Sequence, residues 1–321
     1  MIRRQNSLSN KLFKYDILLT EHREDRHMKI HLDESTLINL DETLCCGQVF
    51  RWEKREEWWY GVAFEKAFRM RQIGNVLEFD NTNIDFIRSY FGLNHDLSQI
   101  YAHVGKDQHI REAIARFGGL RIIRQDPWEC LISYICATYK NIAAIKRTIF
   151  ELSRRFGNEV YFEEQEFYTF PTAKVLTKSS VTDLKKCGLG FRAKYVKRTA
   201  RMILDEKLSL EQLRKTPYDE AKRKLLQLPG VGSKVADCIL LFSLEKLESF
   251  PVDVWMKRVI LRYYHAHFKK EFMDKISREE PLSISQYNRL SEFGREYFGE
   301  YAGYAQEYLY HYERMREQKR F

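Results

Sequence analysis

The sequence predicts an α+β fold, in which an N-terminal antiparallel β domain precedes an all-α body. Two observations carry this prediction. Between residues 29 and 118 the chain holds short, aromatic-rich runs that partly alternate between apolar and polar residues, as strands do. From 119 to 321 the spacing of apolar residues is helical instead, and a Pro-Gly-Val-Gly hairpin separates two of the helices at 220–245.

The whole-chain composition narrows the class of partner. Residues 1–28 are polar and charged, and we expect a flexible arm or an added edge element there, without the apolar core of a secretory signal. No apolar run approaches the roughly 20 residues that a membrane crossing needs. Lys and Arg outnumber Asp and Glu by 54 to 45, which gives a net charge of +9. This basic excess fits a polyanionic partner.

The elements follow from local patterns. In the β domain, strands are predicted over 49–52, 58–64 and 67–71, with charged residues 53–57 as a turn, and helices over 84–90, 97–104 and 109–117. Asp126 and Pro127 are a helix cap and a first-turn proline. In the body, helices are predicted over 128–138, 141–156, 167–170, 175–178, 181–187, 193–206, 208–214, 218–228, 285–298 and 301–316.

The hairpin contains groups suited to a phosphate. Pro229 ends the first helix because it lacks an N–H. Gly230 and Gly232 permit a positive φ and leave the backbone bare, so that a phosphate or another backbone can come close. The second helix begins near Ser233, and its free amides form an anion site. Gly230, Gly232 and Lys234 are therefore predicted to contact a phosphate group.

A lysine and an aspartate near this hairpin indicate a catalytic function. Lys234 lies in the first turn of the second helix, with Cys238 one turn later on the same face. The positive end of the helix dipole should lower the pKa of Lys234, which suits a nucleophilic amine. Asp253 caps a helix predicted over 254–262. Folding can bring the Asp253 carboxylate close to Lys234, although the two are 19 positions apart.

The pattern Leu-Pro-Gly-Val-Gly-x-Lys followed by Val-Asp resembles the helix-hairpin-helix DNA glycosylases. Within that superfamily, residues 234–238 and 251–254 resemble the 8-oxoguanine DNA glycosylase/AP lyase branch, and the likeness extends over roughly 33–312. The resemblance implies a bifunctional base-excision repair enzyme that acts on double-stranded DNA containing 8-oxoguanine. Lys234 would attack the anomeric carbon and form a Schiff base, β-elimination would nick the strand, and Asp253 would stabilise positive charge on the sugar.

The same resemblance assigns the base-recognition residues. Gly47, in Cys-Gly-Gln-Val-Phe-Arg-Trp, matches the glycine whose carbonyl accepts the N7–H that 8-oxoguanine has and guanine lacks. Cys238 and Tyr310 match the groups on the two faces of the extruded base, and Gln306 matches the reader of its Watson–Crick edge.

The residues that face the opposite strand match the family only in part. Asn141 and Arg192 are retained for the orphaned base, and Phe191 matches the aromatic residue that wedges into the duplex. Tyr139 and Lys140 replace two family asparagines, and an alanine replaces an arginine at 144. These departures predict a relaxed preference for the base opposite the lesion. Trp255 replaces a family histidine, which puts that phosphate contact in doubt.

Cofactor and partner expectations follow from the resemblance as well. The backbone carbonyls of Leu226, Leu228 and Val231 match positions that hold a structural monovalent or calcium-type ion. No cofactor is expected for catalysis. The six cysteines have no Cys-x-x-Cys spacing and none follows Cys238, so no iron–sulfur cluster is expected. We expect a monomer in the nucleoid of a bacterium or the nucleus of a eukaryote.

Two alternatives stay open at this stage. A related glycosylase for other damaged bases would use the same lysine and aspartate. A non-catalytic helix-hairpin-helix DNA-binding protein would use Lys234 only to contact phosphate.

Overall fold

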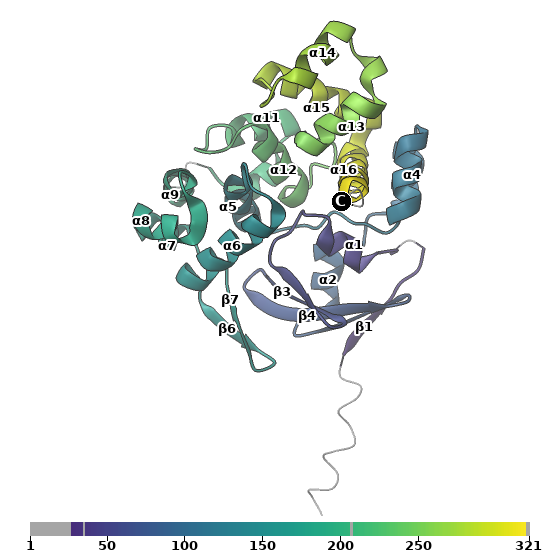
Figure 1. The fold of residues 1–321 in the computed structure, drawn as a ribbon. Helices are drawn as coiled ribbons and strands as arrows, with labels where there is room; N and C mark the ends of the chain where they lie inside the picture. The colour runs from purple at the N-terminus through teal and green to yellow at the C-terminus, as the bar shows by residue number, and fades with distance from the viewer. Residues whose placement is uncertain (1–26, 35, 206–207, 319–321) are drawn as a thin grey trace, which may run out of the picture.

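The computed structural model describes residues 27–34, 36–205 and 208–318. A twisted sheet lies at one end of the molecule and the helices gather at the other, with the C-terminal helix between them (Figure 1). The predicted arm at 1–28 lies outside the described residues except for its last two positions. Within the described residues, no helix combines the length and apolarity that a membrane crossing requires.

The sheet is antiparallel, as the sequence predicted, and its strand order is β1-β5-β4-β3-β2. Its strands are β1 (Met28–His31), β2 (Trp52–Arg55), β3 (Trp58–Ala63), β4 (Lys66–Ile73) and β5 (Val76–Asp80). The predicted turn at 53–57 was wrong in extent. Trp52 to Arg55 pair with Gly61 to Trp58, so that only Glu56 and Glu57 remain in the turn. The charged residues are tolerated because β2 is an exposed edge strand.

Two short helices pack near the sheet. They are α1 (Leu40–Cys45), which the sequence did not predict, and α2 (Ile84–Tyr90). Aromatic and aliphatic side chains such as Trp52, Phe68 and Phe79 fill the core of this domain. Asn39 caps the N-terminus of α1 by accepting from the amide of Glu42, so it fixes where the helix begins, and α1 ends at Cys45, two residues before Gly47.

The next two helices join the helical core rather than the sheet. They are α3 (Leu97–Val104) and α4 (Gln108–Phe117). Their buried residues belong to the same apolar cluster as those of the body, and α4 lies beside the C-terminal helix (Figure 1). The hydroxyl groups of Tyr101 on α3 and Tyr308 on that helix are 2.6 Å apart. The helical core therefore begins before the domain boundary that we predicted at residue 118.

The remaining helices form the body. They are α5 (Pro127–Ala137), α6 (Ile142–Phe156), α7 (Ala173–Lys178), α8 (Val181–Leu184) with a π turn at Lys185–Leu189, α9 (Arg192–Leu204), α10 (Leu210–Lys215), α11 (Tyr218–Leu225), α12 (Ser233–Ser243), α13 (Val254–Tyr263), α14 (Lys270–Arg278), α15 (Ile284–Phe298) and α16 (Ala302–Gln318), with 3-10 turns at His265–His267 and Gly299–Tyr301. Helix α14 was not predicted.

The body also contains a β-hairpin, so it is mostly helical rather than all-α. The hairpin consists of β6 (Glu159–Phe162) and β7 (Gln165–Tyr168). The helix predicted at 167–170 is therefore wrong. The segment is extended because it docks on the sheet: Phe167 stacks on Tyr60 with ring centroids 6.3 Å apart, and Glu163 pairs with Arg69. A four-residue apolar run could not reveal this distant partner.

A buried polar network fixes the helix-hairpin-helix, which is formed by α11 and α12. Asp237 on α12 is fully buried and accepts from the Tyr218 hydroxyl (2.7 Å) and the Lys222 amine (2.9 Å) of α11. It also accepts from the Tyr287 hydroxyl of α15, at 2.6 Å. Such a satisfied network specifies one arrangement of the three helices. It therefore sets the position of Lys234, which lies on the first turn of α12.

Candidate active site

A small cavity brings together residues from both ends of the chain. Its walls come from the loop after α1, from α5, α12 and the start of α13, and from α16. It is lined by Gly47, Gln48, Tyr134, Lys234, Cys238, Phe242, Pro251, Asp253, Gln306, Glu307 and Tyr310. The six residues that the sequence assigned to catalysis and base recognition are all among them. Residues about 260 positions apart thus face one space.

The pKa of Lys234 depends on the groups that surround its amine. Its amine is 4.9 Å from the centre of the Tyr134 ring and hydrogen-bonds the side chain of Cys238. Burial lowers the pKa of Lys234, but its interactions with Cys238 and Asp253 raise it by more. The net shift is upward, so the lowered pKa predicted from the helix dipole was wrong.

Asp253 is the carboxyl group that interacts with Lys234. Burial raises the pKa of Cys238 to about 12, so this cysteine is a neutral thiol rather than a thiolate. Asp253 caps α13, and its Oδ1 accepts from the amides of Trp255 and Met256, both at 2.9 Å. Burial raises the pKa of this carboxyl, whereas Lys234 and the two amides oppose that shift. The cap fixes the direction of the carboxylate.

Gly47 has a backbone conformation that strongly favours glycine. Its φ is +106°, and a Cβ added there would lie 2.8 Å from Ile142 Cδ1 and 2.9 Å from Arg314 Nη1. Arg314 donates to the carbonyl of Cys46 (2.5 Å) and to that of Cys45 (2.8 Å). Sequence reasoning missed Arg314, because nothing in a charged C-terminal helix marks one arginine as a clamp on a distant loop.

We expect Gly47→Ala to destabilise the protein by about 1–3 kcal/mol, since alanine strains a positive-φ position. The added methyl group also pushes Arg314 from the Cys46 carbonyl, which should displace the Gly47 carbonyl from the cavity. Thermal unfolding and excision assays check this. Gly74→Ala is the matched control, because its φ is also positive (+57°) but a Cβ there meets nothing within 4 Å. Equal loss of base excision in both variants would contradict a specific role for Gly47.

Helix α16 supplies the polar wall of the cavity. Gln306 and Glu307 are 4% and 2% exposed, and the Oε1 atom of each lacks a hydrogen-bond partner among the described residues. Tyr310 follows one turn after Gln306, with the Arg314 guanidinium 5.5 Å from its ring centre. The cavity has a volume of about 50 Å³, far below the roughly 300–1,000 Å³ of typical ligand sites. A purine therefore enters only if side chains in its walls move.

The hairpin glycines differ in their geometry. Gly230 has φ +86°, and a Cβ there would lie 2.9 Å from the Tyr195 side chain, so it serves close packing. Gly232 has φ −94°, which corrects the expected positive φ, and a Cβ there would meet nothing within 4 Å. No side chain caps α12 at Gly232. The first amides of α12 are thus not covered by a side chain at Gly232, and the N-terminus of this helix is a suitable anion site.

The three hairpin carbonyls suit a hard or monovalent cation by their donor type. These are the carbonyls of Leu226, Leu228 and Val231. The Leu228 carbonyl already accepts from the Val231 amide at 3.1 Å, which leaves it one lone pair for an ion.

The residues predicted to meet the duplex lie outside the cavity. Asn141 is exposed and caps α6 through the amide of Ala144, at 2.9 Å. Phe191 is 56% exposed, as an intercalating wedge requires. Arg192 is buried and donates to the carbonyls of Thr138 and Leu189. It therefore ties α9 to the loop that precedes Asn141.

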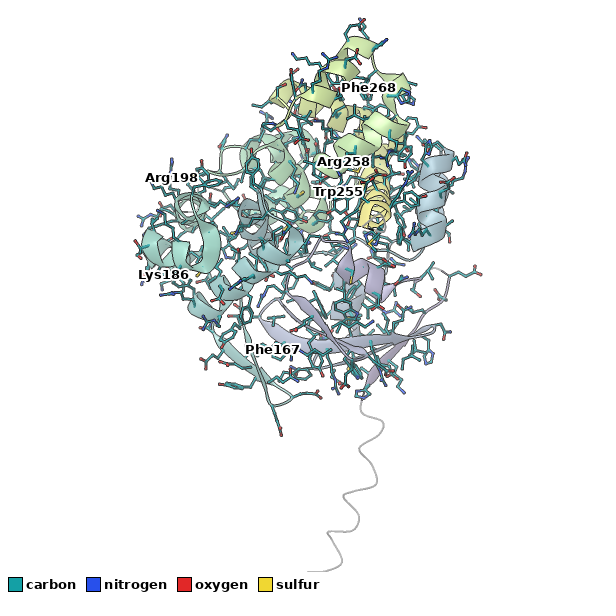
Figure 2. The ribbon with its side chains drawn as sticks, in the orientation of Figure 1. Phe167, Lys186, Arg198, Trp255, Arg258 and Phe268 are labelled. Carbon is teal, nitrogen blue, oxygen red and sulfur yellow. The ribbon has the colours of Figure 1, made fainter. Side chains whose placement is uncertain are left out.

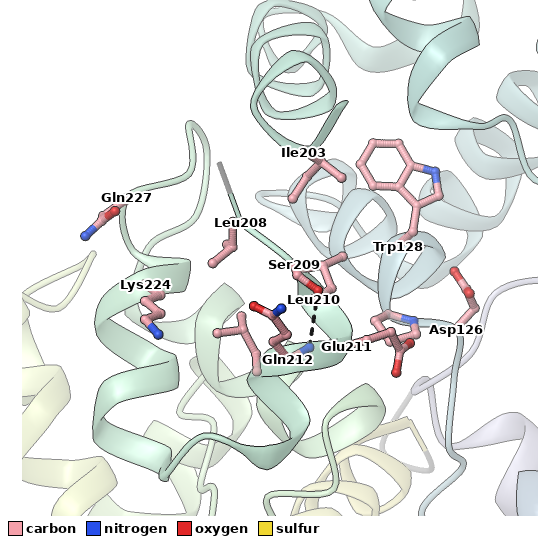
Figure 3. A pocket seen from close by; sticks show the side chains of 12 residues that line it. Asp126, Trp128, Ile203, Leu208, Ser209, Leu210, Glu211, Gln212, Lys224 and Gln227 are labelled. Atoms are coloured by element: carbon pink, nitrogen blue, oxygen red, sulfur yellow. Dashed lines mark hydrogen bonds between the residues drawn. The ribbon is translucent and has the colours of Figure 1, made fainter. Parts of the chain in front are cut away.

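Two other features surround this site. A larger cavity of about 790 Å³ lies between the N-terminus of α5 and α10, but none of the predicted site residues lines it (Figure 3). On α13, Trp255 and the exposed Arg258 project from the same helix, with the guanidinium 4.8 Å from the indole (Figure 2).

Comparison with known proteins agrees with this geometry. Residues 29–131 match the family described as 8-oxoguanine DNA glycosylase, N-terminal domain, and residues 132–280 match the HhH-GPD superfamily base excision DNA repair protein. A probable N-glycosylase/DNA lyase of Methanothermobacter thermautotrophicus is 34% identical over 71% of this chain and 74% of its own length. The N-glycosylase/DNA lyase of Saccharomyces cerevisiae is 30% identical over 88% and 85%.

A solved structure extends the likeness to three dimensions. The 8-oxoguanine glycosylase/lyase of Clostridium acetobutylicum, in complex with double-stranded DNA containing cytosine opposite 8-oxoguanine, is 32% identical with a TM-score of 0.80. The alignment covers 91% of this chain and 99% of that one. The two family matches, the relatives and this structure show that the chain belongs to the 8-oxoguanine DNA glycosylase/lyase family of the helix-hairpin-helix superfamily.

Proposed function

We propose that the protein excises 8-oxoguanine from double-stranded DNA and then cleaves the strand as an AP lyase. One observation carries the proposal: Lys234 and Asp253 share a single cavity with Gly47, Cys238 and Gln306. A phosphate-binding hairpin without catalysis would not need a lysine that turns inward towards a carboxylate. The net charge of +9 and the open N-terminus of α12 support DNA as the partner.

The chemistry requires Lys234 to lose a proton first, because its raised pKa keeps it an ammonium ion at rest. The departing base is the final acceptor of this proton, so that Asp253 stays a carboxylate. The neutral amine attacks C1′, the C1′–N9 bond breaks, and its electron pair leaves with the base, which takes up the proton that Lys234 lost. Asp253 stabilises the positive charge that develops on the sugar. The C1′–O4′ bond then opens to give a Schiff base between Lys234 and C1′.

The strand break follows from the Schiff base. The imine acidifies the C2′ proton, and its removal expels the 3′ phosphate by cleavage of the C3′–O bond. A glycosylase that uses water as nucleophile would release the base but leave the strand intact. The position of Lys234 in the cavity supports the class that uses an amine as nucleophile.

Borohydride trapping tests the proposal, since it reduces a Schiff base to a stable adduct. The wild-type protein is incubated with duplexes that contain one 8-oxoguanine, one guanine or one damaged pyrimidine. We expect base release and a covalent adduct with 8-oxoguanine only. Base release without an adduct would indicate a water-using glycosylase. An adduct only with a damaged pyrimidine would assign the protein to another substrate class.

We expect excision rates within about tenfold of each other when cytosine, adenine, guanine or thymine lies opposite 8-oxoguanine. The charged side chains at the positions predicted to face the opposite base already hydrogen-bond within the protein. Lys140 donates to Thr148 and to the Gly188 carbonyl, at 2.5 and 2.8 Å, and Arg192 donates to backbone carbonyls. A lost side-chain hydrogen bond to the opposite base is worth about tenfold. Single-turnover rates on the four duplexes check this, and a cytosine preference above about 100-fold would contradict it.

We also propose that the protein acts as a monomer, because one chain supplies every residue that lines the cavity. The hairpin carbonyls are proposed to hold a monovalent or calcium-type ion that supports DNA binding rather than catalysis. Exchange of potassium for a bulky organic cation should then weaken DNA affinity without changing the rate of the bound complex.

A further inference from the structure

Glu307 is a buried acid in the cavity that the proposed chemistry does not use. It lies next to Gln306 on α16, lines the cavity with Lys234 and Asp253, and is 2% exposed. Its Oε1 atom lacks a hydrogen-bond partner among the described residues. A buried unpaired acceptor costs about 1–3 kcal/mol, so its presence calls for an explanation.

Two of the cationic groups near Glu307 are committed elsewhere. The third, Lys234, lies close enough for the charge of Glu307 to raise its pKa, but no ion pair joins the two residues. Arg314 donates to the carbonyls of Cys45 and Cys46. The ring of His311 lies 2.6 Å from Glu42. The hydrogen-bond partner of the carboxyl is the Cys46 thiol, a weak donor. Glu307 is therefore not one half of a buried salt bridge, which would be its ordinary structural role.

Two residues that line the cavity, consecutive on α16, thus each have an acceptor without a partner among the described residues: Gln306 Oε1 and Glu307 Oε1. Two adjacent acceptors complement two adjacent N–H donors. A guanine-type base presents this pair on its Watson–Crick edge, as N1–H and the 2-amino group. An adenine-type base presents a lone pair at N1, which would face one of these acceptor oxygens. A base that lacks the 2-amino group would leave one of the two acceptors unpaired.

We propose that Glu307 is a specificity-determining residue that accepts a hydrogen bond from the 2-amino group on the Watson–Crick edge of an extruded guanine-type base, while Gln306 accepts from N1–H. The inference rests on the proposed function and deepens it. The cavity would then select bases that carry a 2-amino group through Glu307, whereas Gly47 recognises the oxidised N7 position. Burial raises the pKa of Glu307, and its carboxyl group can accept a hydrogen bond whether or not it is ionised.

The test compares single-turnover excision of 8-oxoguanine and of 8-oxohypoxanthine, which lacks only the 2-amino group. Wild type, Glu307→Ala and Glu307→Gln are measured, with Glu296→Ala as a control that removes an exposed carboxylate from α15. We expect Glu307→Ala to slow 8-oxoguanine excision about 10- to 100-fold and 8-oxohypoxanthine excision much less. Glu307→Gln keeps one acceptor oxygen and should retain more of the selectivity.

Strand cleavage at a preformed abasic site separates recognition from folding. No base is present there, so Glu307→Ala should slow this reaction far less than it slows 8-oxoguanine excision. An equal loss on all three substrates, or no loss at all, would overturn the inference. A wild-type protein inactive on 8-oxoguanine would instead overturn the proposed function itself, so the two failures are distinguishable.

Discussion

Lys234→Gln is expected to abolish the borohydride adduct and to slow base excision by on the order of 10³-fold or more. Glutamine has nearly the length of lysine but cannot form a Schiff base with C1′. Its amide can still face Asp253 across the cavity that both residues line. Gel analysis of trapped complexes and single-turnover excision measure the two effects, and DNA affinity measured in parallel should change only a few fold.

The control for this variant is Lys194→Gln, which removes one positive charge from an exposed position on α9. It should keep the adduct, because Lys194 does not line the cavity. If Lys234→Gln still gives an adduct, another amine is the nucleophile. If it binds DNA normally and excises the base at the wild-type rate, Lys234 only contacts DNA.

Asp253→Asn is expected to slow base excision by about 10²- to 10³-fold, the loss typical of removing one preorganised electrostatic group. Asparagine is also a good helix cap and can accept from the amides of Trp255 and Met256. The thermal midpoint should therefore stay near that of the wild type. Asp253→Ala removes both functions, and its additional loss of about 1 kcal/mol in unfolding free energy reports the cap alone.

The pH dependence of base excision tests the same role of Asp253. Burial raises the pKa of Asp253, and the reaction requires its carboxylate form. Wild-type excision should thus be present above that raised pKa and fall as the pH drops through it. This acidic limb lies at a higher pH than the value near 3.9 of a free aspartate. The Asp253→Asn variant should lack the limb, and an unchanged limb in that variant would assign it to another group.

Local sequence signals located most of the catalytic apparatus. Pro229 and Gly230 mark the hairpin because their backbone limits are intrinsic to the residues. Asp253 marks a helix start because a short acceptor side chain there satisfies free amides. Family motifs then placed Gly47, Cys238, Gln306 and Tyr310, and the structure brings all of them to one cavity.

The same signals fail where a partner lies far along the chain. The hairpin of β6 and β7 is extended because Phe167 meets Tyr60 on the sheet, a contact that no local pattern encodes. The loop of Gly47 is held by Arg314, 267 positions later. These contacts exist only after the two parts of the chain have packed.

The sequence by itself thus determined the α+β order of elements, the helix-hairpin-helix, and the identity of the lysine, the aspartate and the glycine. Only the tertiary structure decided their electrostatic state. The helix dipole predicted a lowered pKa for Lys234, but Cys238 and Asp253 beside it reverse the direction. It also showed that Glu307 faces the cavity with a free acceptor. The physical reason is that pKa and hydrogen-bond satisfaction depend on every group packed around a site, whereas backbone preferences belong to single residues.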